Sequence, residues 1–180
     1  MKAVFLDRDG VINADRDDYV KSAVELRIYP FAATSIARLN KAGYRVVVVS
    51  NQQGVAKGLI SEQDLLEMQT EISRQVRAAG GEIDAFYYCR HLASEGCSCR
   101  KPEPGLLLKA ADDLRIDLTM STIIGDSERD LVAGMRAGCG KTILVLTGKI
   151  SRSDVAGMGV RPDYVAEDLS EAVDHLLKDE

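Results

Sequence analysis

The chain has 180 residues, of which 46% are hydrophobic, and carries a formal net charge of −5 at pH 7. This length and apolar content are enough for one hydrophobic core, so we expect residues 1–180 to form a single domain. The acidic balance argues against a nucleic-acid partner, because a nucleic-acid-binding face would be basic.

No stretch of the sequence is apolar over the roughly 20 residues that span a bilayer, and the first residues show no signal-peptide pattern. We therefore expect a cytoplasmic protein without a membrane partner. We also expect it to be a monomer. In that reducing compartment the four cysteines should be thiols or metal ligands and not disulfides.

The first predicted element is a buried strand at residues 3–6, which is followed at once by Asp7 and Asp9. Four consecutive apolar residues indicate a strand that is covered on both faces. Ligands of open parallel α/β sheets bind at the carboxyl ends of the strands, where these two carboxylates would lie. The pair favours a divalent ion such as Mg²⁺, with Asp7 free to attack a substrate through its second oxygen. The alternative is an acidic turn without a catalytic role.

The next segment, residues 14–26, is polar, acidic and without periodicity. We expect most of its charges to be solvated on a surface loop. Because the segment follows the two aspartates directly, Asp15 and Tyr19 are candidates for contact with a substrate.

A helix is predicted from Pro30 to Gly43, and a second buried strand at residues 44–49 ends in Ser50 and Asn51. Serine and asparagine are common in ordinary turns. At the end of a strand next to Asp7, however, the Ser50 hydroxyl would be placed to donate to a phosphate oxygen.

A further helix should begin at Ser61, which is a good capping residue, and a third strand is expected at residues 83–88. Four potential zinc ligands follow within eleven residues: Cys89, His91, Cys97 and Cys99. Three thiolates and one imidazole match a closed, four-coordinate structural zinc site. The alternative is a set of reduced surface thiols. We expect zinc to brace the loop at about residues 89–101.

Arg100 and Lys101 leave this loop side by side, just before a predicted helix that starts near Pro102 and Pro104. A planar guanidinium and a compact ammonium suit a phosphorylated ligand. Two solvated basic residues would be the alternative, but a metal-braced loop would hold both side chains still.

The fourth predicted strand, residues 122–125, is again followed by acidic residues. Asp126 and Asp130 are four residues apart at a helix start, and Met135 is expected to pack behind them. Acidic residues also stabilise a helix N-terminus without any metal. Two more strands are expected, and Ser170 is predicted to cap the closing helix.

Strands and helices alternate along the whole chain, which predicts an α/β fold, a doubly wound three-layer sandwich with a mostly parallel sheet and no separate cap domain. Three strand ends and one loop then bring acids, a hydroxyl and a lysine to one edge of the sheet. Phosphoryl transfer needs such a set of groups.

The motifs resemble those of the haloacid-dehalogenase-like (HAD-like) phosphohydrolases over essentially the whole chain. The four matching motifs are Asp7-Arg8-Asp9-Gly10, Ser50, Lys101, and Gly125-Asp126 through Asp130. The resemblance narrows to the family of D-glycero-D-manno-heptose 1,7-bisphosphate 7-phosphatases and the related histidinol-phosphate phosphatases. Three stretches support this narrower match. They are Ser50-Asn51-Gln52-Gln53-Gly54, Leu146-Thr147-Gly148-Lys149 and the cysteine cluster that runs into Arg100-Lys101-Pro102.

The resemblance implies a magnesium-dependent phosphatase for a small phosphorylated sugar, acting through an aspartyl-phosphate on Asp7 with Asp9 as general acid and base. The implied Mg²⁺ ligands are Asp7, the backbone carbonyl of Asp9, and Asp126, with Asp130 as a ligand or a support for one. Ser50, Asn51 and Lys101 are implied to bind the transferring phosphoryl group, and Arg100 to recognise the substrate. The zinc is implied to be structural.

The order of these hypotheses follows from the sequence around residues 53–58, which resembles the heptose enzymes more than the histidinol-phosphate enzymes. Removal of the 7-phosphate of the heptose bisphosphate is therefore the first hypothesis, and histidinol-phosphate hydrolysis is the second. A zinc-braced binding module, whose acids only stabilise helix ends, is the hypothesis from another class. Magnesium-dependent release of phosphate would exclude it.

Overall fold

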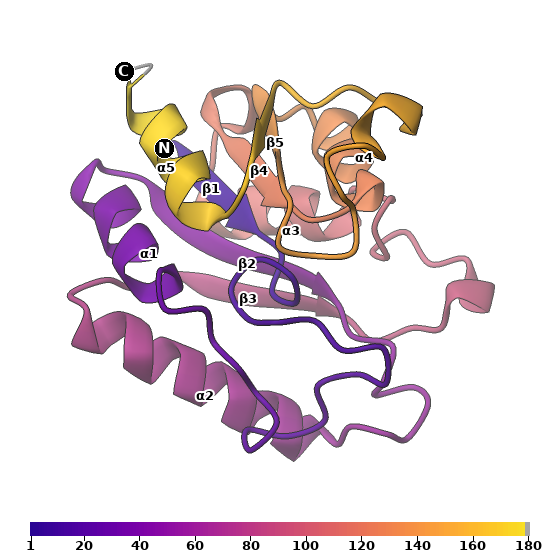
Figure 1. The fold of residues 1–180 in the computed structure, drawn as a ribbon. Helices are drawn as coiled ribbons and strands as arrows, with labels where there is room; N and C mark the ends of the chain where they lie inside the picture. Colours follow the sequence, from indigo (N-terminus) through magenta and orange to yellow (C-terminus); the bar gives the residue numbers. More distant parts are fainter. Residues whose placement is uncertain (179–180) are drawn as a thin grey trace.

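The centre of the protein is a parallel sheet of six strands in the order β3-β2-β1-β4-β5-β6 (Figure 1). The computed structural model describes residues 1–178. Within them the strands are β1 (Ala3–Leu6), β2 (Arg45–Asn51), β3 (Ala85–Cys89), β4 (Thr122–Gly125), β5 (Lys141–Val145) and β6 (Tyr164–Ala166). This strand order is that of a doubly wound α/β fold, so the predicted fold class is confirmed.

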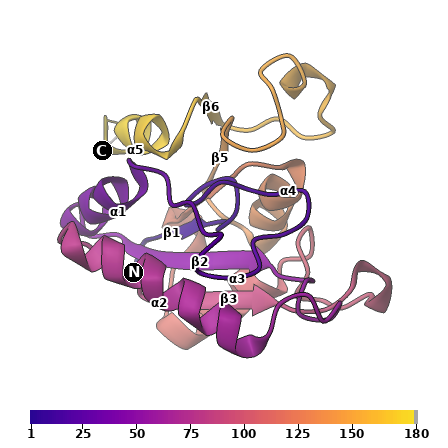
Figure 2. The ribbon, with the colours of Figure 1, turned by 60° about the horizontal axis from the view of Figure 1, so that its bottom comes forward.

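Helices cover both faces of the sheet, which makes three layers (Figures 1 and 2). One face carries α1 (Ala32–Lys41), α2 (Glu62–Ala78) and α5 (Leu169–Lys178). The opposite face carries α3 (Gly105–Leu114) and α4 (Glu128–Ala137).

Alternation along β1 explains why its apolar run has no polar interruption. Val4 and Leu6 belong to the core under α1, α2 and α5, whereas Ala3 and Phe5 belong to the core under α3 and α4. Successive side chains of a strand point to opposite faces, and all four side chains are fully buried here. The strand therefore needs apolar residues at every position.

The order of the strands places the end of β1 between the ends of β2 and β4. Leu6 is level with Val48 of β2 and with Ile124 of β4. Directly after Leu6, the backbone N–H of Asp7 donates to the carbonyl of Ile124 at 3.1 Å. This is the point where the strand order reverses, and it is where ligands of doubly wound folds bind.

Two helices begin with reciprocal capping boxes. Ser61 and Asp64 exchange hydrogen bonds at the start of α2, as predicted from Ser61, and Ser127 and Asp130 do so at the start of α4. Asp126 thus lies in the turn before α4 and not in the helix. Each box satisfies backbone N–H groups that have no partner within the helix.

Two details of the sequence interpretation are wrong. Met135 is 42% exposed on α4 and does not pack behind the acidic cluster. Ser170 lies inside α5, and the side chain of Asp168 instead accepts the Glu171 N–H at 3.0 Å near the helix start. None of the helices described within residues 1–178 is both long and apolar enough to cross a membrane.

Candidate active site

A cavity of about 410 Å³ opens at the carboxyl ends of β1, β2 and β4. All ten residues that were predicted to bind phosphate, substrate or magnesium lie in its wall. They are Asp7, Asp9, Asp15, Tyr19, Ser50, Asn51, Arg100, Lys101, Asp126 and Asp130. The topology therefore assembles, from four distant parts of the chain, the set that the sequence predicted.

Three carboxylates meet at the floor of this cavity. Oxygen atoms of Asp7, Asp126 and Asp130 all lie within 4.8 Å of one another. Burial raises the pKa of Asp7 to about 6, with Asp130 raising it further and Lys101 opposing the shift. Burial, together with Asp7 and Asp130, raises the pKa of Asp126 to about 8. Such crowded carboxylates are poorly compatible with ionisation unless a cation joins them.

The donor set fits a hard divalent ion. It consists of carboxylate oxygens, which Mg²⁺ prefers over nitrogen or sulfur. Two glycines leave room for the Asp126 carboxylate, because a Cβ at Gly10 or at Gly148 would overlap it. Gly10 also has φ +82°, a backbone conformation that glycine adopts at little cost.

Lys101 supplies the positive charge on the other side of Asp7. Its Nζ lies 3.0 Å from Asp7 Oδ2 and 2.5 Å from Asp130 Oδ1, and it donates to the carbonyl of Val49 at 2.7 Å. Burial alone would lower the pKa of Lys101, but Asp130 and Asp7 outweigh burial and raise it. Lys101 is therefore a fixed, buried cation beside the proposed nucleophile.

Asn51 holds the main chain of that lysine. Its amide Nδ2 donates to the Lys101 carbonyl at 2.9 Å, and its Oδ1 accepts the Lys101 N–H at 3.0 Å. The end of β2 is thereby joined to the loop that carries Lys101. Ser50, which precedes Asn51, is buried and accepts a hydrogen bond from Gln52 Nε2 at 3.1 Å.

Asp9 is held by three residues that the sequence analysis missed. Arg8 binds both oxygens of its carboxylate, Asn13 Nδ2 donates to Oδ1 at 2.8 Å, and Gln52 Nε2 donates to Oδ2 at 2.8 Å. The Arg8 side chain is fully buried, as is Asn13. An arginine directly after an apolar strand, between two aspartates, was the available signal for this arrangement.

The segment after β1 covers one side of the cavity. Lys149 lies 2.8 Å from Asp17 and 3.5 Å from Asp15, which links the segment to the loop after β5. Tyr19, at φ +69°, accepts hydrogen bonds from Gln53 Nε2 at 2.9 Å and Lys57 Nζ at 2.7 Å. Asp15 and Tyr19 are thus both positioned where they can contact a bound molecule.

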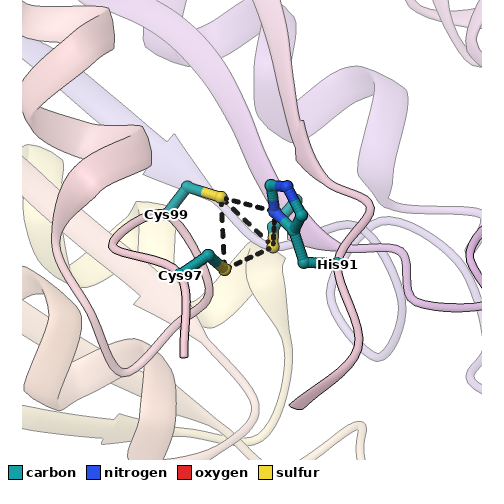
Figure 3. Close-up of side chains that lie close together, drawn as sticks. His91, Cys97 and Cys99 are labelled. Carbon is teal, nitrogen blue, oxygen red and sulfur yellow. Dashed lines mark hydrogen bonds between the residues drawn. The ribbon is translucent and has the colours of Figure 1, made fainter. Parts of the chain in front are cut away.

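Next to the cavity, the four predicted zinc ligands lie together in the loop that joins β3 to α3. His91, Cys97 and Cys99 turn their side chains toward one another (Figure 3). Sulfur-to-sulfur distances among Cys89, Cys97 and Cys99 are 3.3, 3.5 and 3.6 Å, and His91 Nδ1 lies 3.2 Å from Cys99 and 3.6 Å from Cys89. With metal–sulfur bonds of about 2.3 Å, the corners of a tetrahedron are roughly 3.7 Å apart.

The chemistry of the cluster also fits zinc. Burial and the two neighbouring thiols raise the pKa of Cys99 to about 12, which opposes ionisation of all three thiols together. A soft divalent cation would favour the thiolates, and four protein donors would fill its coordination shell. The loop that carries the cluster projects from the body of the protein and contains few buried apolar side chains (Figure 1).

Comparisons with known proteins identify phosphatases as relatives of this chain. A family model described as HAD-hydrolase-like matches residues 98–172. D-glycero-beta-D-manno-heptose-1,7-bisphosphate 7-phosphatase of Neisseria meningitidis is 44% identical over 149 residues, which cover 83% of this chain and 79% of the relative. The protein of the same name from Bordetella bronchiseptica is 38% identical over 179 residues and 99% of both chains.

Solved structures show the same similarity. The crystal structure of D,D-heptose 1,7-bisphosphate phosphatase from B. bronchiseptica, complexed with magnesium and phosphate, has a TM-score of 0.93 and 40% identity over 100% of both chains. A putative HAD-like phosphatase from Mesorhizobium loti has a TM-score of 0.80 and 33% identity, covering 99% of this chain and 85% of that one.

Proposed function

The chain belongs to the family of D-glycero-β-D-manno-heptose-1,7-bisphosphate 7-phosphatases within the HAD-like hydrolases, and from this membership we propose that it hydrolyses the 7-phosphate ester of that sugar bisphosphate. The observation that carries the proposal is the cavity in which Asp7, Asp9 and Lys101 converge with the carboxylate of Asp126.

Asp7 is the nucleophile in this proposal. One of its carboxylate oxygens attacks the phosphorus, the bond between phosphorus and the sugar oxygen breaks, and an aspartyl-phosphate forms. The position of Asp7 is well defined, because its Oδ1 accepts the Arg8 N–H at 2.7 Å and its Oδ2 faces Lys101. Water then attacks the phosphorus, and the bond to Asp7 breaks to release inorganic phosphate.

Asp9 moves the protons of both steps. It gives a proton to the departing sugar oxygen, and it takes one from the attacking water in the second step. Its carboxylate is 20% exposed and lines the cavity, so it is accessible to the reacting groups while its neighbours hold it in place.

Lys101 and Ser50 bind the transferring phosphoryl group. A fixed ammonium beside Asp7 offsets negative charge on the phosphoryl oxygens without reorganisation during the reaction. Asn51 is assigned to the same group of residues, and its two hydrogen bonds to the Lys101 main chain give it a positioning role as well.

The metal-binding residues in this proposal are Asp7, the backbone carbonyl of Asp9, and Asp126. When bound, Mg²⁺ would neutralise negative charge on the phosphoryl group. Both oxygens of Asp130 already have partners, because Oδ2 accepts from Ser127 and Oδ1 faces Lys101. We therefore assign Asp130 to supporting the site.

Zinc, held by Cys89, His91, Cys97 and Cys99, is structural in this proposal. The cluster ends one residue before Arg100 and two before Lys101, so it fixes the approach of the chain to the cavity. Four protein ligands leave no open position for a substrate or a water molecule.

The test is the release of phosphate from D-glycero-β-D-manno-heptose 1,7-bisphosphate, measured with and without Mg²⁺. Histidinol phosphate, assayed alongside, is the competing substrate. We expect magnesium-dependent turnover with a higher kcat/KM for the heptose bisphosphate. A higher kcat/KM for histidinol phosphate, or release without Mg²⁺ at the same rate, would overturn the proposal.

A further inference from the structure

The buried side chain of Arg8 holds Asp9 with only two of its three guanidinium nitrogens. Its Nε and Nη2 donate to the carboxylate at 2.9 to 3.1 Å. Its Nη1 is enclosed by the protein and makes no hydrogen bond to any residue from 1 to 178. An enclosed N–H group without an acceptor is costly, so this third nitrogen of Arg8 requires an explanation.

The hydroxyl of Tyr88, near the end of β3, is unpartnered in the same way. It is enclosed and has no hydrogen bond within the described part of the chain. Other tyrosine hydroxyls do have partners: Tyr87 donates to Asp113 at 2.8 Å, and Tyr29 donates to the carbonyl of Thr147 at 2.9 Å. A buried phenol usually finds such a partner. Tyr88 is also not among the residues that line the active-site cavity.

The sheet brings the side chains of Arg8 and Tyr88 to the same place. Arg8 follows Leu6 of β1 by two residues, as Ser50 follows Val48 of β2, and Leu6 is level with Val48. Ser50 in turn is level with Tyr88 of β3. Since residues two apart share a face, Arg8, Ser50 and Tyr88 form a row across three neighbouring chain segments. The backbones at its two ends are about 10 Å apart, and the short Ser50 side chain leaves the space between them to its two long neighbours.

The electrostatics of the two groups agree with this placement. Burial raises the pKa of the Tyr88 phenol, and the positive charge of Arg8 opposes that rise. Burial would lower the pKa of the Arg8 guanidinium, but Asp9 and Tyr88 outweigh burial and raise it. Each group thus acts on the other, as expected for neighbours in a protein interior.

We propose that Tyr88 is a positioning residue for the acid-base Asp9, on which it acts through Arg8. The Tyr88 oxygen accepts a hydrogen bond from Arg8 Nη1, directly or through one enclosed water molecule, so that all three nitrogens of the guanidinium are held. The planar group then cannot rotate away from Asp9, whose carboxylate must point at the departing sugar oxygen. This inference rests on the proposed phosphatase function and adds to it a residue from outside the cavity wall.

Tyr88→Phe tests the proposal, because phenylalanine removes the hydroxyl and keeps the ring that packs against Phe86. Turnover is compared on D-glycero-β-D-manno-heptose 1,7-bisphosphate and on an aryl phosphate, both at saturating Mg²⁺. On the sugar bisphosphate we expect kcat to fall about 10-fold, the scale of one hydrogen bond, with KM unchanged because Tyr88 does not touch the substrate. On the aryl phosphate, whose leaving oxygen needs little protonation, the loss should stay below about twofold.

Tyr87→Phe is the matched control. It removes a hydroxyl from the next residue of the same strand, on the opposite face, where that hydroxyl binds Asp113. It should leave kcat on both esters unchanged. A second comparison adds Tyr88→Phe to Asp9→Asn. The further loss on the sugar bisphosphate should be below about twofold, because no acid-base group is left to position.

A merely structural role of the Tyr88 hydroxyl would give different results. Equal losses on both esters in Tyr88→Phe, or no loss on either, would overturn the assignment of Tyr88. So would a full additional loss in the Asp9→Asn background. If the wild type released no phosphate from the heptose bisphosphate, the proposed function would fail and this inference with it. The wild-type assay alone distinguishes that case from a failure of the Tyr88 assignment.

Discussion

Arg8 and Asp9, adjacent in the sequence, form a side-chain pair in which the guanidinium holds both oxygens of the carboxylate. The three hydrogen bonds are 2.9, 3.0 and 3.1 Å long. The Arg8 side chain is completely buried, whereas Asp9 keeps 20% of its side chain exposed toward the cavity. The buried partner therefore fixes the orientation of the exposed one.

This pairing sharpens the expected behaviour of Asp9→Asn. The amide cannot transfer the protons, so turnover of the heptose bisphosphate should fall by about 10²–10⁴-fold. An aryl phosphate should lose less, because its leaving oxygen needs little protonation. Affinity for Mg²⁺ should change little, since the proposed ligand at this position is the backbone carbonyl. Equal rate losses on both esters, measured by phosphate release, would show that Asp9 is not the acid of the first step.

Asp7→Asn should abolish turnover, because a carboxamide cannot form the aspartyl-phosphate. The thermal stability of the Asp7→Asn variant, in contrast to its activity, should not fall. Burial raises the pKa of Asp7 to about 6, so ionising it at neutral pH is costly in the absence of metal. We expect the melting temperature of magnesium-free Asp7→Asn at pH 7.5 to be equal to or above that of wild type. Turnover close to the wild-type rate would rule out the covalent mechanism.

The crowded carboxylates also predict how stability depends on pH in magnesium-free buffer. The pKa values are about 6 for Asp7 and about 8 for Asp126, against 3.8 for an ordinary aspartate. The folded state therefore holds protons that the unfolded state has already released, and this contribution is complete below pH 4. It is lost as the pH rises through 6 and 8. The melting temperature should fall by about 5–10 °C between pH 5 and pH 8.5.

Added Mg²⁺ should reverse this loss, and more so at pH 8 than at pH 5, where protons compete with the metal. Thermal unfolding is the suitable measurement. The buffers should contain no chelator, because a chelator would also remove zinc. Asp126→Asn is the control and should flatten the pH dependence. A melting temperature that rises with pH in wild type without Mg²⁺ would contradict the interpretation.

The zinc loop yields the fourth prediction. One zinc per chain should copurify with the protein, as measured by elemental analysis. Cys97→Ser should lower the zinc content, the melting temperature and the affinity for the bisphosphate together, because the brace on Arg100 and Lys101 is weakened. Cys139→Ser is the matched control, since that thiol lies outside the cluster and should leave the zinc content unchanged. Zinc-free protein with full activity would refute the structural role.

The sequence was sufficient to predict the fold because the chain alternates buried strands and amphipathic helices. The strand at residues 3–6 and the helix that begins after Ser61 were recognisable from local patterns alone. Met135 and Ser170 were misplaced because a helical pattern does not say which neighbours cover a given residue, or which of several polar residues caps the end.

The same limit applies to the site. Acids at strand ends could be predicted, since their exposure to a ligand is a property of the topology. The contact of Gln52 with Asp9 could not be predicted, because it joins two segments that are far apart in the sequence. Arg8 and Asn13 are close to Asp9 in the sequence, but a local pattern does not show that their side chains turn toward its carboxylate.

The position of β1 between β2 and β4 affects how the chain can fold while it is being synthesised on the ribosome. Asp7 is made before β4 and Asp126, which follow it in the sequence by more than a hundred residues. Until then the nascent chain can pair β1 only with β2, and two of the three carboxylates of the cluster have not yet been made. Magnesium cannot assist the early steps of folding, and it can only stabilise a chain whose central sheet is already complete.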